Sequence, residues 1–355
     1  MIIIAGPTGV GKTELSLKLA AQLKSPAIIN ADLGQFYTPL TIGTAKPDWC
    51  HEPMPHYLFD ILDQPENFTA FQYRRLVIEL LEKLNSVIAN NRSNTTPILV
   101  GGSGFYLQAL FFKSPLDKLY PEASDNSPAF YDNNSPESSP EKILALENLK
   151  LWEKLNQIDP VRARELNSHD HYRIQRALEI WQKYKILPSQ AKPEYAPIVP
   201  QTQKIKLLIL TRDLPELYAR IDQRVLEMLD AGWATEVQNL VDTPWEKFLL
   251  AKRLIGYDDL LKFFRAAKSN CVVSSRYLNS EKIAASTVQL IQKRSRNYAK
   301  RQIAFFKMLT RQLTEKSAGQ IEIEWLNLTA TDVDLYIKRL LSDPNFAKIA
   351  SLKSE

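Results

Sequence analysis

Short apolar runs alternate with longer amphipathic stretches through the first third of the chain. Residues 1–5, 27–31 and 97–100 are largely apolar and each is too short for a helix, whereas residues 14–23 and 70–89 place apolar side chains at helical spacing. Short buried strands that alternate with helices predict a parallel sheet with helices on both faces. We therefore expect an α/β fold, in which ligands bind at the carboxyl ends of the strands.

The rest of the chain is expected to be mostly helical. Residues 142–185 and 215–264 repeat apolar positions at helical spacing, and residues 204–210 and 321–328 read as two further strands, the last followed by a helix. Residues 120–141 differ, because they are rich in Pro, Ser and Asn and carry five acidic and no basic residues. We interpret this segment as a surface excursion or the tip of a lid.

These patterns divide the chain into three predicted parts. The α/β core comprises residues 1–113 together with about 171–211 and 285–340. Residues 114–170 are expected to form a flexible or helical insertion or lid, and residues 212–284 a helical segment.

The composition is that of a folded globular protein. Hydrophobic residues make up 45% and charged residues 24% of 355 positions, which excludes a disordered or fibrous chain. Eight of the 11 glycines fall within the first 104 positions, which indicates a ligand-binding N-terminal third, since glycine permits sharp turns and close approach. The opening apolar run is too short to span a membrane and lacks the form of a signal peptide. We therefore expect a cytoplasmic protein with no membrane partner, whose isolated Cys50 and Cys271 are reduced.

Residues 6–13 read GPTGVGKT and fit the phosphate-loop pattern, with a predicted strand before them and a predicted helix after them. Loop amides and a helix N-terminus bind phosphate, Lys12 supplies a positive charge, and the Thr13 hydroxyl can hold Mg²⁺. The predicted phosphate-binding residues are Gly6, Thr8, Gly9, Val10, Gly11, Lys12 and Thr13. The loop by itself does not identify the phosphate compound.

The strand expected to supply an acidic partner for this loop lacks one. Residues 98–100 lead into Gly-Gly-Ser-Gly, and the acid is instead Asp32, after the second strand. This weakens the ATPase and GTPase readings more than that of a small-molecule kinase. A strand-end carboxylate beside a phosphate loop can accept a proton from an incoming nucleophile. Alternatively, Asp32 caps a helix or forms a hydrogen bond to a ligand of the metal ion.

Residues 282–314 contain eight basic and no acidic residues. Five of the eight share one helix face by their spacing, namely Lys293, Arg296, Lys300, Lys307 and Arg311. A solvated helix surface is the plain interpretation of such a run. The absence of acids over 33 positions favours a polyanionic partner.

Nine motifs now stand in one order along the chain. They are GPTGVGKT at 6–13, NADLGQFY at 30–37, IGTAKP at 42–47, PHYLFDI at 55–61, VGGSGFY at 100–106, HDHYRIQRALEI at 169–180, RIDQRVLEML with the following G and EV at 220–237, LIGYDDL at 254–260 and SRNYAKRQ at 295–302. In this order they resemble the bacterial and organellar tRNA dimethylallyltransferases, also called tRNA isopentenyltransferases. The resemblance implies a P-loop NTPase-like parallel sheet flanked by helices, with helical insertions for tRNA, the segment 212–284 among them.

The resemblance also implies substrates and roles. The donor is dimethylallyl diphosphate, the acceptor is the exocyclic amine of the adenine 3′ to the tRNA anticodon, Mg²⁺ is the cofactor, and the protein is a monomer. Asp32 corresponds to the general base, Ser103 to a Thr that hydrogen-bonds the reacting region, and Arg224 with Arg220 to the cations that neutralise the diphosphate. The implied tRNA contacts are Asp32, Leu33, Gly34, Gln35, Tyr172, Arg173, Ile174, Gln175 and Arg176, to which the basic face adds Lys293, Arg296 and Lys300.

Several positions depart from the family pattern. Leu33 replaces a Ser, Ser103 replaces the Thr but retains its hydroxyl, and Ser295, Ala304 and Phe305 differ from the family motif near residues 295–305. Three alternatives stay open from the sequence. An adenylate isopentenyltransferase using free adenine nucleotide would not need the basic stretch at 282–314. A small-molecule kinase and a non-catalytic RNA-binding P-loop protein are the other two.

Overall fold

The computed structural model describes residues 1–91, 95–114, 141–269 and 283–350. The chain separates into two compact units, the first containing residues 1–111 and 197 onward, the second built within residues 112–196. The predicted acidic excursion at 120–141 falls almost wholly outside the described residues. The predicted core segment at about 171–211 spans the boundary between the units, and the helical segment expected at 212–284 belongs to the first unit.

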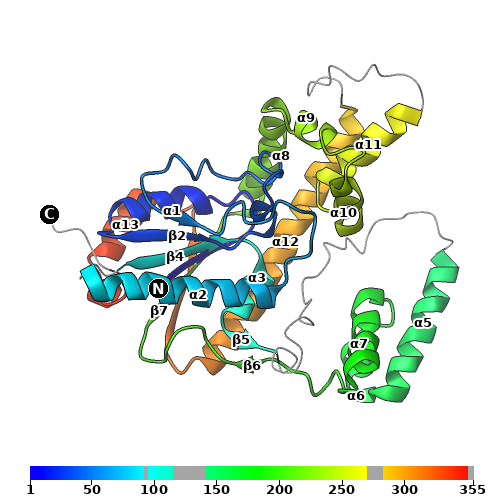
Figure 1. The fold of residues 1–355 in the computed structure, drawn as a ribbon, viewed down its shortest axis with the longest axis horizontal. Helices are drawn as coiled ribbons and strands as arrows, with labels where there is room; N and C mark the ends of the chain where they lie inside the picture. Colours follow the sequence, from blue (N-terminus) through cyan, green and yellow to red (C-terminus); the bar gives the residue numbers. More distant parts are fainter. Residues whose placement is uncertain (92–94, 115–140, 270–282, 351–355) are drawn as a thin grey trace. The chain divides into compact units, whose positions relative to one another are not determined.

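A six-stranded sheet forms the centre of the first unit (Figure 1). Its strand order is β3-β2-β4-β1-β7-β8, and every neighbouring pair is parallel. The strands are β1 (Ile2–Ala5), β2 (Pro26–Asn30), β3 (His56–Tyr57), β4 (Thr96–Gly101), β7 (Ile205–Thr211) and β8 (Ile321–Asn327). The predicted α/β class and its main strands are confirmed, whereas the two-residue β3 has no signal in the hydrophobic pattern.

The apolar strands predicted from the sequence occupy the middle of the sheet. Ile3 of β1 lies between Leu99 of β4 and Leu207 of β7, and all three side chains are buried. A strand covered on both faces needs apolar residues at successive positions, which explains the unbroken run at Ile2–Ala5. Because the strands are parallel, the segments that follow β1, β2, β4 and β7 meet at one edge of the sheet.

Helices flank this sheet and extend beyond it. They are α1 (Lys12–Ala21), the 3₁₀ helix η1 (Leu33–Phe36), α2 (Ala70–Asn91), α3 (Gly104–Ala109), α8 (Leu214–Asp230), α9 (Trp233–Gln238), α10 (Pro244–Lys252), α11 (Tyr257–Ser269), α12 (Ala285–Lys316), α13 (Val333–Leu341) and α14 (Pro344–Ala347). The 32-residue α12 packs against α8, α11, α3 and β8, so it connects the sheet with the helices α8 to α11 (Figure 1). Gly232 follows the last turn of α8 with a φ of 100° and thereby ends that helix.

The second unit is a small helical body. It contains α5 (Glu141–Ile158), α6 (Pro160–Glu165), α7 (His171–Tyr184) and an antiparallel pair, β5 (Phe112–Lys113) with β6 (Glu194–Tyr195). Asp159 and Asp170 accept hydrogen bonds from the first turns of α6 and α7, as N-cap residues do. Leu155, Ile174 and Leu178 are among the residues that form its hydrophobic core.

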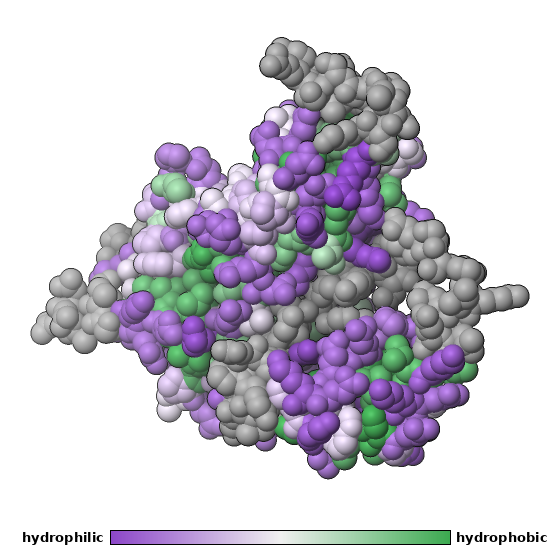
Figure 2. All heavy atoms as spheres, turned by 45° about the vertical axis from the view of Figure 1, so that its right-hand side comes forward, coloured by the Kyte–Doolittle hydropathy of each residue, from purple (hydrophilic) through white to green (hydrophobic). Residues whose placement is uncertain are grey.

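The helices and the surface of the described residues can be compared with those of membrane proteins. No helix there is long and apolar enough to cross a membrane. On the face that Figure 2 shows, hydrophilic side chains predominate and the hydrophobic patches are separate.

Candidate active site

The phosphate loop lies between β1 and α1, as its sequence predicts. Gly9 and Gly11 have φ values of 76° and 109°, a backbone conformation that side-chain-bearing residues rarely adopt. The Lys12 ammonium donates hydrogen bonds to the carbonyls of Gly6 (3.1 Å) and Pro7 (3.0 Å) and so lies across the loop. Burial lowers the pKa of Lys12 to about 8, although Asp32 opposes this shift. The loop therefore holds a partly desolvated cation at its centre.

Three arginines at the end of β7 and on α8 contact this loop. Arg224 donates to the Thr8 hydroxyl (3.2 Å), Arg220 to the Gly9 carbonyl (3.1 Å) and Arg212 to the Val10 carbonyl (2.9 Å). Burial lowers the pKa of Arg224, but a guanidinium stays charged in proteins. Arg212 was not expected from the sequence, because nothing in its local pattern marks it as a loop contact. The loop thus combines its amides with several fixed positive charges.

Asp32 follows β2, which β4 separates from β1, and it faces the phosphate loop from its own strand end. Asn30 fixes its backbone by accepting from the Asp32 amide (2.8 Å) and donating to the Asp32 carbonyl (3.1 Å). The amide of Gly102 donates to the Asp32 carboxylate (3.3 Å). Burial raises the pKa of Asp32, opposed first by Lys12, then by the Gly102 amide and Arg224. The carboxylate is therefore more basic than an exposed one and is held beside the positive end of the site.

Ser103 lies at the start of α3, directly before its first turn. Its hydroxyl oxygen accepts a hydrogen bond from the Leu33 amide (2.9 Å), and its own amide donates to Ala31 (3.3 Å). A hydroxyl that accepts one bond can still donate its proton to a substrate. The contact uses the backbone of position 33, so Leu33 in place of Ser leaves it intact.

Gln302 of α12 was present in the motifs but carried no predicted role. The residue is 6% exposed, and its side chain accepts from the Thr8 amide (2.9 Å) and donates to the Gly102 carbonyl (2.8 Å). It therefore joins the phosphate loop to the glycine-rich loop after β4.

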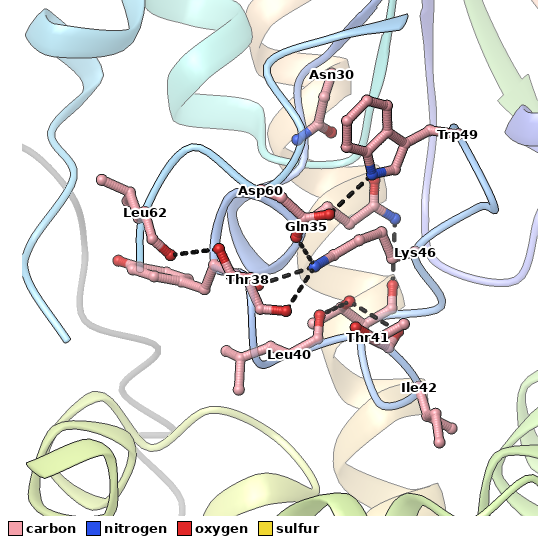
Figure 3. A network of polar contacts seen from close by, with 12 residues as sticks. Asn30, Gln35, Thr38, Leu40, Thr41, Ile42, Lys46, Trp49, Asp60 and Leu62 are labelled. Atoms are coloured by element: carbon pink, nitrogen blue, oxygen red, sulfur yellow. Dashed lines mark hydrogen bonds and ion pairs between the residues drawn. The ribbon is translucent and has the colours of Figure 1, made fainter. Parts of the chain in front are cut away.

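The segment from η1 to residue 46 forms another wall of the site. Lys46, whose side chain is 2% exposed, forms an ion pair with Asp60 and donates to the Thr38 carbonyl (3.3 Å), as Figure 3 shows. It also donates to the Tyr37 carbonyl (2.9 Å). Trp49 donates to the other oxygen of Asp60 (2.8 Å) (Figure 3). Lys46 is thus a structural cation that holds the backbone of residues 37 and 38 in place.

Glu236 of α9 holds the same segment from the other side. Its carboxylate accepts from the amides of Thr41 (3.0 Å), Ile42 (2.6 Å) and Gly43 (3.3 Å) and from the Tyr257 hydroxyl (2.6 Å). The conformation of the wall is therefore determined by side chains distant in sequence.

These elements enclose one pocket of about 700 Å³ in the first unit. Lys12, Thr13 and Arg224 line its phosphate end, and Asp32 and Gln35 line it from the second strand. Apolar and aromatic side chains complete it, including Met228, Trp233, Leu254, Ile255 and Tyr257. One cavity thus presents an anion site, a carboxylate and an apolar wall.

The predicted tRNA contacts are distributed over three places. Leu33, Gly34 and Gln35 belong to η1 in the first unit, and Lys293, Arg296 and Lys300 to α12. Residues 172–176 lie on α7 of the second unit, where Arg173 and Gln175 are exposed. Ile174 instead fills the core of that unit and is fully buried, because it falls on the apolar side of α7.

The fold and site together define a P-loop α/β protein whose pocket has cations at one end and a carboxylate facing them. The model of the IPP transferase family matches residues 35–309. The tRNA dimethylallyltransferase of Latilactobacillus sakei subsp. sakei (strain 23K) is 33% identical over 335 residues, which cover 92% of each chain. The chain therefore belongs to the IPP transferase family, as the nine motifs predict.

Several solved structures resemble the whole chain, and two of them show the extent of this likeness. A tRNA delta(2)-isopentenylpyrophosphate transferase from Staphylococcus epidermidis is 27% identical with a TM-score of 0.54, covering 97% of this chain and 98% of that one. A eukaryotic dimethylallyltransferase acting on tRNA is 24% identical with a TM-score of 0.66, covering 100% and 81%. The second likeness supports the fold alone, and both agree with the predicted P-loop NTPase-like class.

Proposed function

We propose that this chain is a tRNA dimethylallyltransferase. It transfers the dimethylallyl group of dimethylallyl diphosphate to the exocyclic amine of the adenine 3′ to the tRNA anticodon. The observation that carries the proposal is one pocket with Lys12 and Arg224 at its phosphate end and Asp32 facing them. A transferase of this kind needs a site for a departing diphosphate and a base for an incoming amine within reach of each other.

The phosphate end of the pocket suits the departing diphosphate. When the allylic carbon–oxygen bond breaks, its electron pair goes to the diphosphate, and negative charge develops on the bridging oxygen. The loop amides, Lys12 and Arg224 are already in place to stabilise this charge, with Arg220 at the rim. The leaving group is therefore stabilised by groups that need little rearrangement.

Asp32 and Ser103 suit the acceptor. The amine nitrogen attacks the allylic carbon and loses one proton to the Asp32 carboxylate, whose pKa burial raises. The hydroxyl of Ser103, anchored on the Leu33 amide, can donate to the reacting region. The adenine must leave its stack to reach this carboxylate, and the aromatic and apolar wall of the pocket offers it a surface.

Mg²⁺ is part of the proposal. Thr13 is exposed at the phosphate end, and the described residues contain no cluster of three or more His, Cys, Asp or Glu side chains. This donor set fits Mg²⁺, which keeps several waters and uses substrate phosphates with one or two protein ligands. Bound there by Thr13 and the diphosphate, the ion would add positive charge against the leaving group.

The tRNA is proposed to contact η1, α7 and the exposed basic side of α12. We further propose, from the family resemblance, that the protein works as a monomer in the cytoplasm.

The proposal is tested by incubating the protein with dimethylallyl diphosphate, Mg²⁺ and either unmodified tRNA or AMP, followed by mass spectrometry of both acceptors. We expect a gain of one dimethylallyl group on tRNA alone. A gain on AMP alone would establish an adenylate isopentenyltransferase, and ATP turnover without prenyl transfer would establish a kinase.

A further inference from the structure

We propose that Gln302 is a positioning residue that sets the distance between the diphosphate site and the general base. This inference rests on the proposed function, because it assigns a role within the same transfer. Its basis is the bridge that one side-chain amide makes between two loops, to Thr8 on one side and to Gly102 on the other.

The bridge is part of a continuous series of hydrogen bonds across the site. Arg224 donates to the Thr8 hydroxyl, the Thr8 amide donates to Gln302, Gln302 donates to the Gly102 carbonyl, and the Gly102 amide donates to Asp32. Each link is between 2.8 and 3.3 Å long. The series therefore begins at a cation for the leaving group and ends at the base for the acceptor.

The chemistry of the amide fits this place. Its oxygen is needed for an N–H and its nitrogen for a carbonyl, so among side chains of this length only Gln satisfies both backbone groups. Gln302 is buried, and a backbone group left unpaired there would carry a desolvation cost. Gln302 is the partner of both the Thr8 amide and the Gly102 carbonyl.

Gly102 packs closely against the bridge. A Cβ added to Gly102 would lie 2.5 Å from the Gln302 amide nitrogen and 3.2 Å from the Gly6 carbonyl oxygen. The absence of a side chain at Gly102 thus lets the two loops approach each other closely, and Gln302 holds them at that separation. Because reacting atoms must be held about 3–3.5 Å apart, a shift of about 1 Å between the loops can cost about 100-fold in rate.

Q302M tests the inference, since it keeps the length of the side chain and removes both hydrogen bonds. We expect the single-turnover rate of prenyl transfer to fall about 100-fold. The dissociation constants for dimethylallyl diphosphate and for tRNA should each change less than about threefold, because each half of the site remains. The matched control is Q312M on the same helix, which removes an amide bonded to Gln108 at 3.4 Å and should leave all three quantities unchanged.

A second readout does not depend on transfer. Loss of the bridge in Q302M should weaken the hydrogen bond from the Gly102 amide to Asp32 and so raise the pKa of the Asp32 carboxyl. This pKa is measured by ¹³C NMR of labelled aspartate, and D32N assigns the Asp32 signal. The charged or titratable groups that face Asp32 are Lys12 from the phosphate loop, Arg224 from α8 and Tyr298 from α12, and all three are retained in Q302M. This readout tests the bridge even if the wild-type protein transfers nothing to tRNA, which is how failure of the proposed function would appear.

An unchanged rate in Q302M, or diphosphate affinity that falls in parallel with the rate, would overturn the positioning role. If Q302M melts below the assay temperature, Q302E replaces it, since this isosteric variant keeps the acceptor for Thr8 and loses the donor for Gly102. The expected result for Q302E is the same loss of rate with retained tRNA affinity. A full rate in Q302E would also overturn the inference.

Discussion

The two sides of α12 carry similar residue types and have different environments. On the inward side, Arg294 is 6% exposed and paired with the buried Asp258 and Asp259, and Gln302 joins two loops of the site. On the outward side, Lys300 and Lys307 are exposed to solvent. Burial with a partner therefore separates cations that stabilise the fold from cations available to a polyanion. The inward side should govern rate and stability, and the outward side should govern RNA affinity.

Asp32→Asn should have the largest effect, and this effect should be on the rate of prenyl transfer alone. An amide cannot accept the proton of the incoming amine, so the transfer rate should fall by a factor of about 10² to 10⁴. Affinity for tRNA should change little, because Asn keeps the size and shape of the Asp32 side chain and the other proposed tRNA contacts are untouched. Rapid-quench measurement of prenyl transfer, with tRNA binding measured in parallel, checks this. Transfer that persists within about tenfold of wild type would show that Asp32 is not the base.

Arg294→Met should have the largest effect on stability. It would leave Asp258 and Asp259 buried without their cation, and breaking a buried pair in this way typically costs about 3–5 kcal/mol of unfolding free energy. The pKa of Asp258 is already raised to about 6 by burial and Asp259, and loss of the guanidinium should raise it further. The folded variant then binds more protons than the unfolded chain, so its stability should fall as the pH rises through the folded pKa.

Urea denaturation between pH 5 and 8 tests this expectation. The deficit of Arg294→Met against wild type should be smaller at pH 5 than at pH 8. Lys293→Met, which removes a neighbouring exposed cation of α12, should change the free energy of unfolding by no more than about 0.5 kcal/mol. Equal losses in both variants would contradict the contrast between the two sides of the helix.

Lys12 should make diphosphate binding depend on pH. Its pKa in the unliganded site is lowered to about 8, so above this pH an increasing fraction of the protein lacks the ammonium charge. The dissociation constant for dimethylallyl diphosphate should therefore rise by up to about tenfold per pH unit above pH 8. Calorimetric titration from pH 7 to 9.5 checks this. Lys12→Arg keeps the charge and should flatten the dependence, and a wild-type profile that is already flat would contradict it.

The phosphate loop and Asp32 could be predicted because their signals are local. A glycine-rich loop between a strand and a helix is visible in eight consecutive residues, and parallel strands bring their carboxyl ends to one edge. The helical spacing likewise assigned five basic residues to one face of α12, namely Lys293, Arg296, Lys300, Lys307 and Arg311. Four of them are exposed in the structure, whereas Arg296 is partly buried and forms an ion pair with Asp222.

The contacts of Gln302, Arg212 and Lys46 could not be predicted in this way. Gln302 contacts the backbone of Thr8 and Gly102, which are 294 and 200 positions away in the sequence. Almost every residue has a backbone N–H and a carbonyl, so the sequence does not mark these two as partners. Arg212 reaches a backbone carbonyl 202 positions away for the same reason. Lys46 reads as an ordinary surface charge until the fold brings Asp60 against it. Contacts that form only when the chain folds, whether to a backbone group or to another side chain, leave no mark on the local sequence pattern.

The smallest expected effect belongs to the outward side of α12. Lys300→Ala combined with Lys307→Ala removes two exposed charges and should weaken tRNA binding, lowering the slope of log affinity against log salt by up to about two units. The transfer rate at saturating tRNA should stay near wild type, in contrast to Asp32→Asn. Fluorescence anisotropy with a labelled anticodon stem-loop over a salt series measures the slope. Lys338→Ala with Lys348→Ala, on and after the distant α13, removes the same charge from another exposed surface and should leave the slope unchanged. If both double variants lower the slope equally, the charge of the protein as a whole acts on tRNA, and the outward side of α12 has no special part in binding.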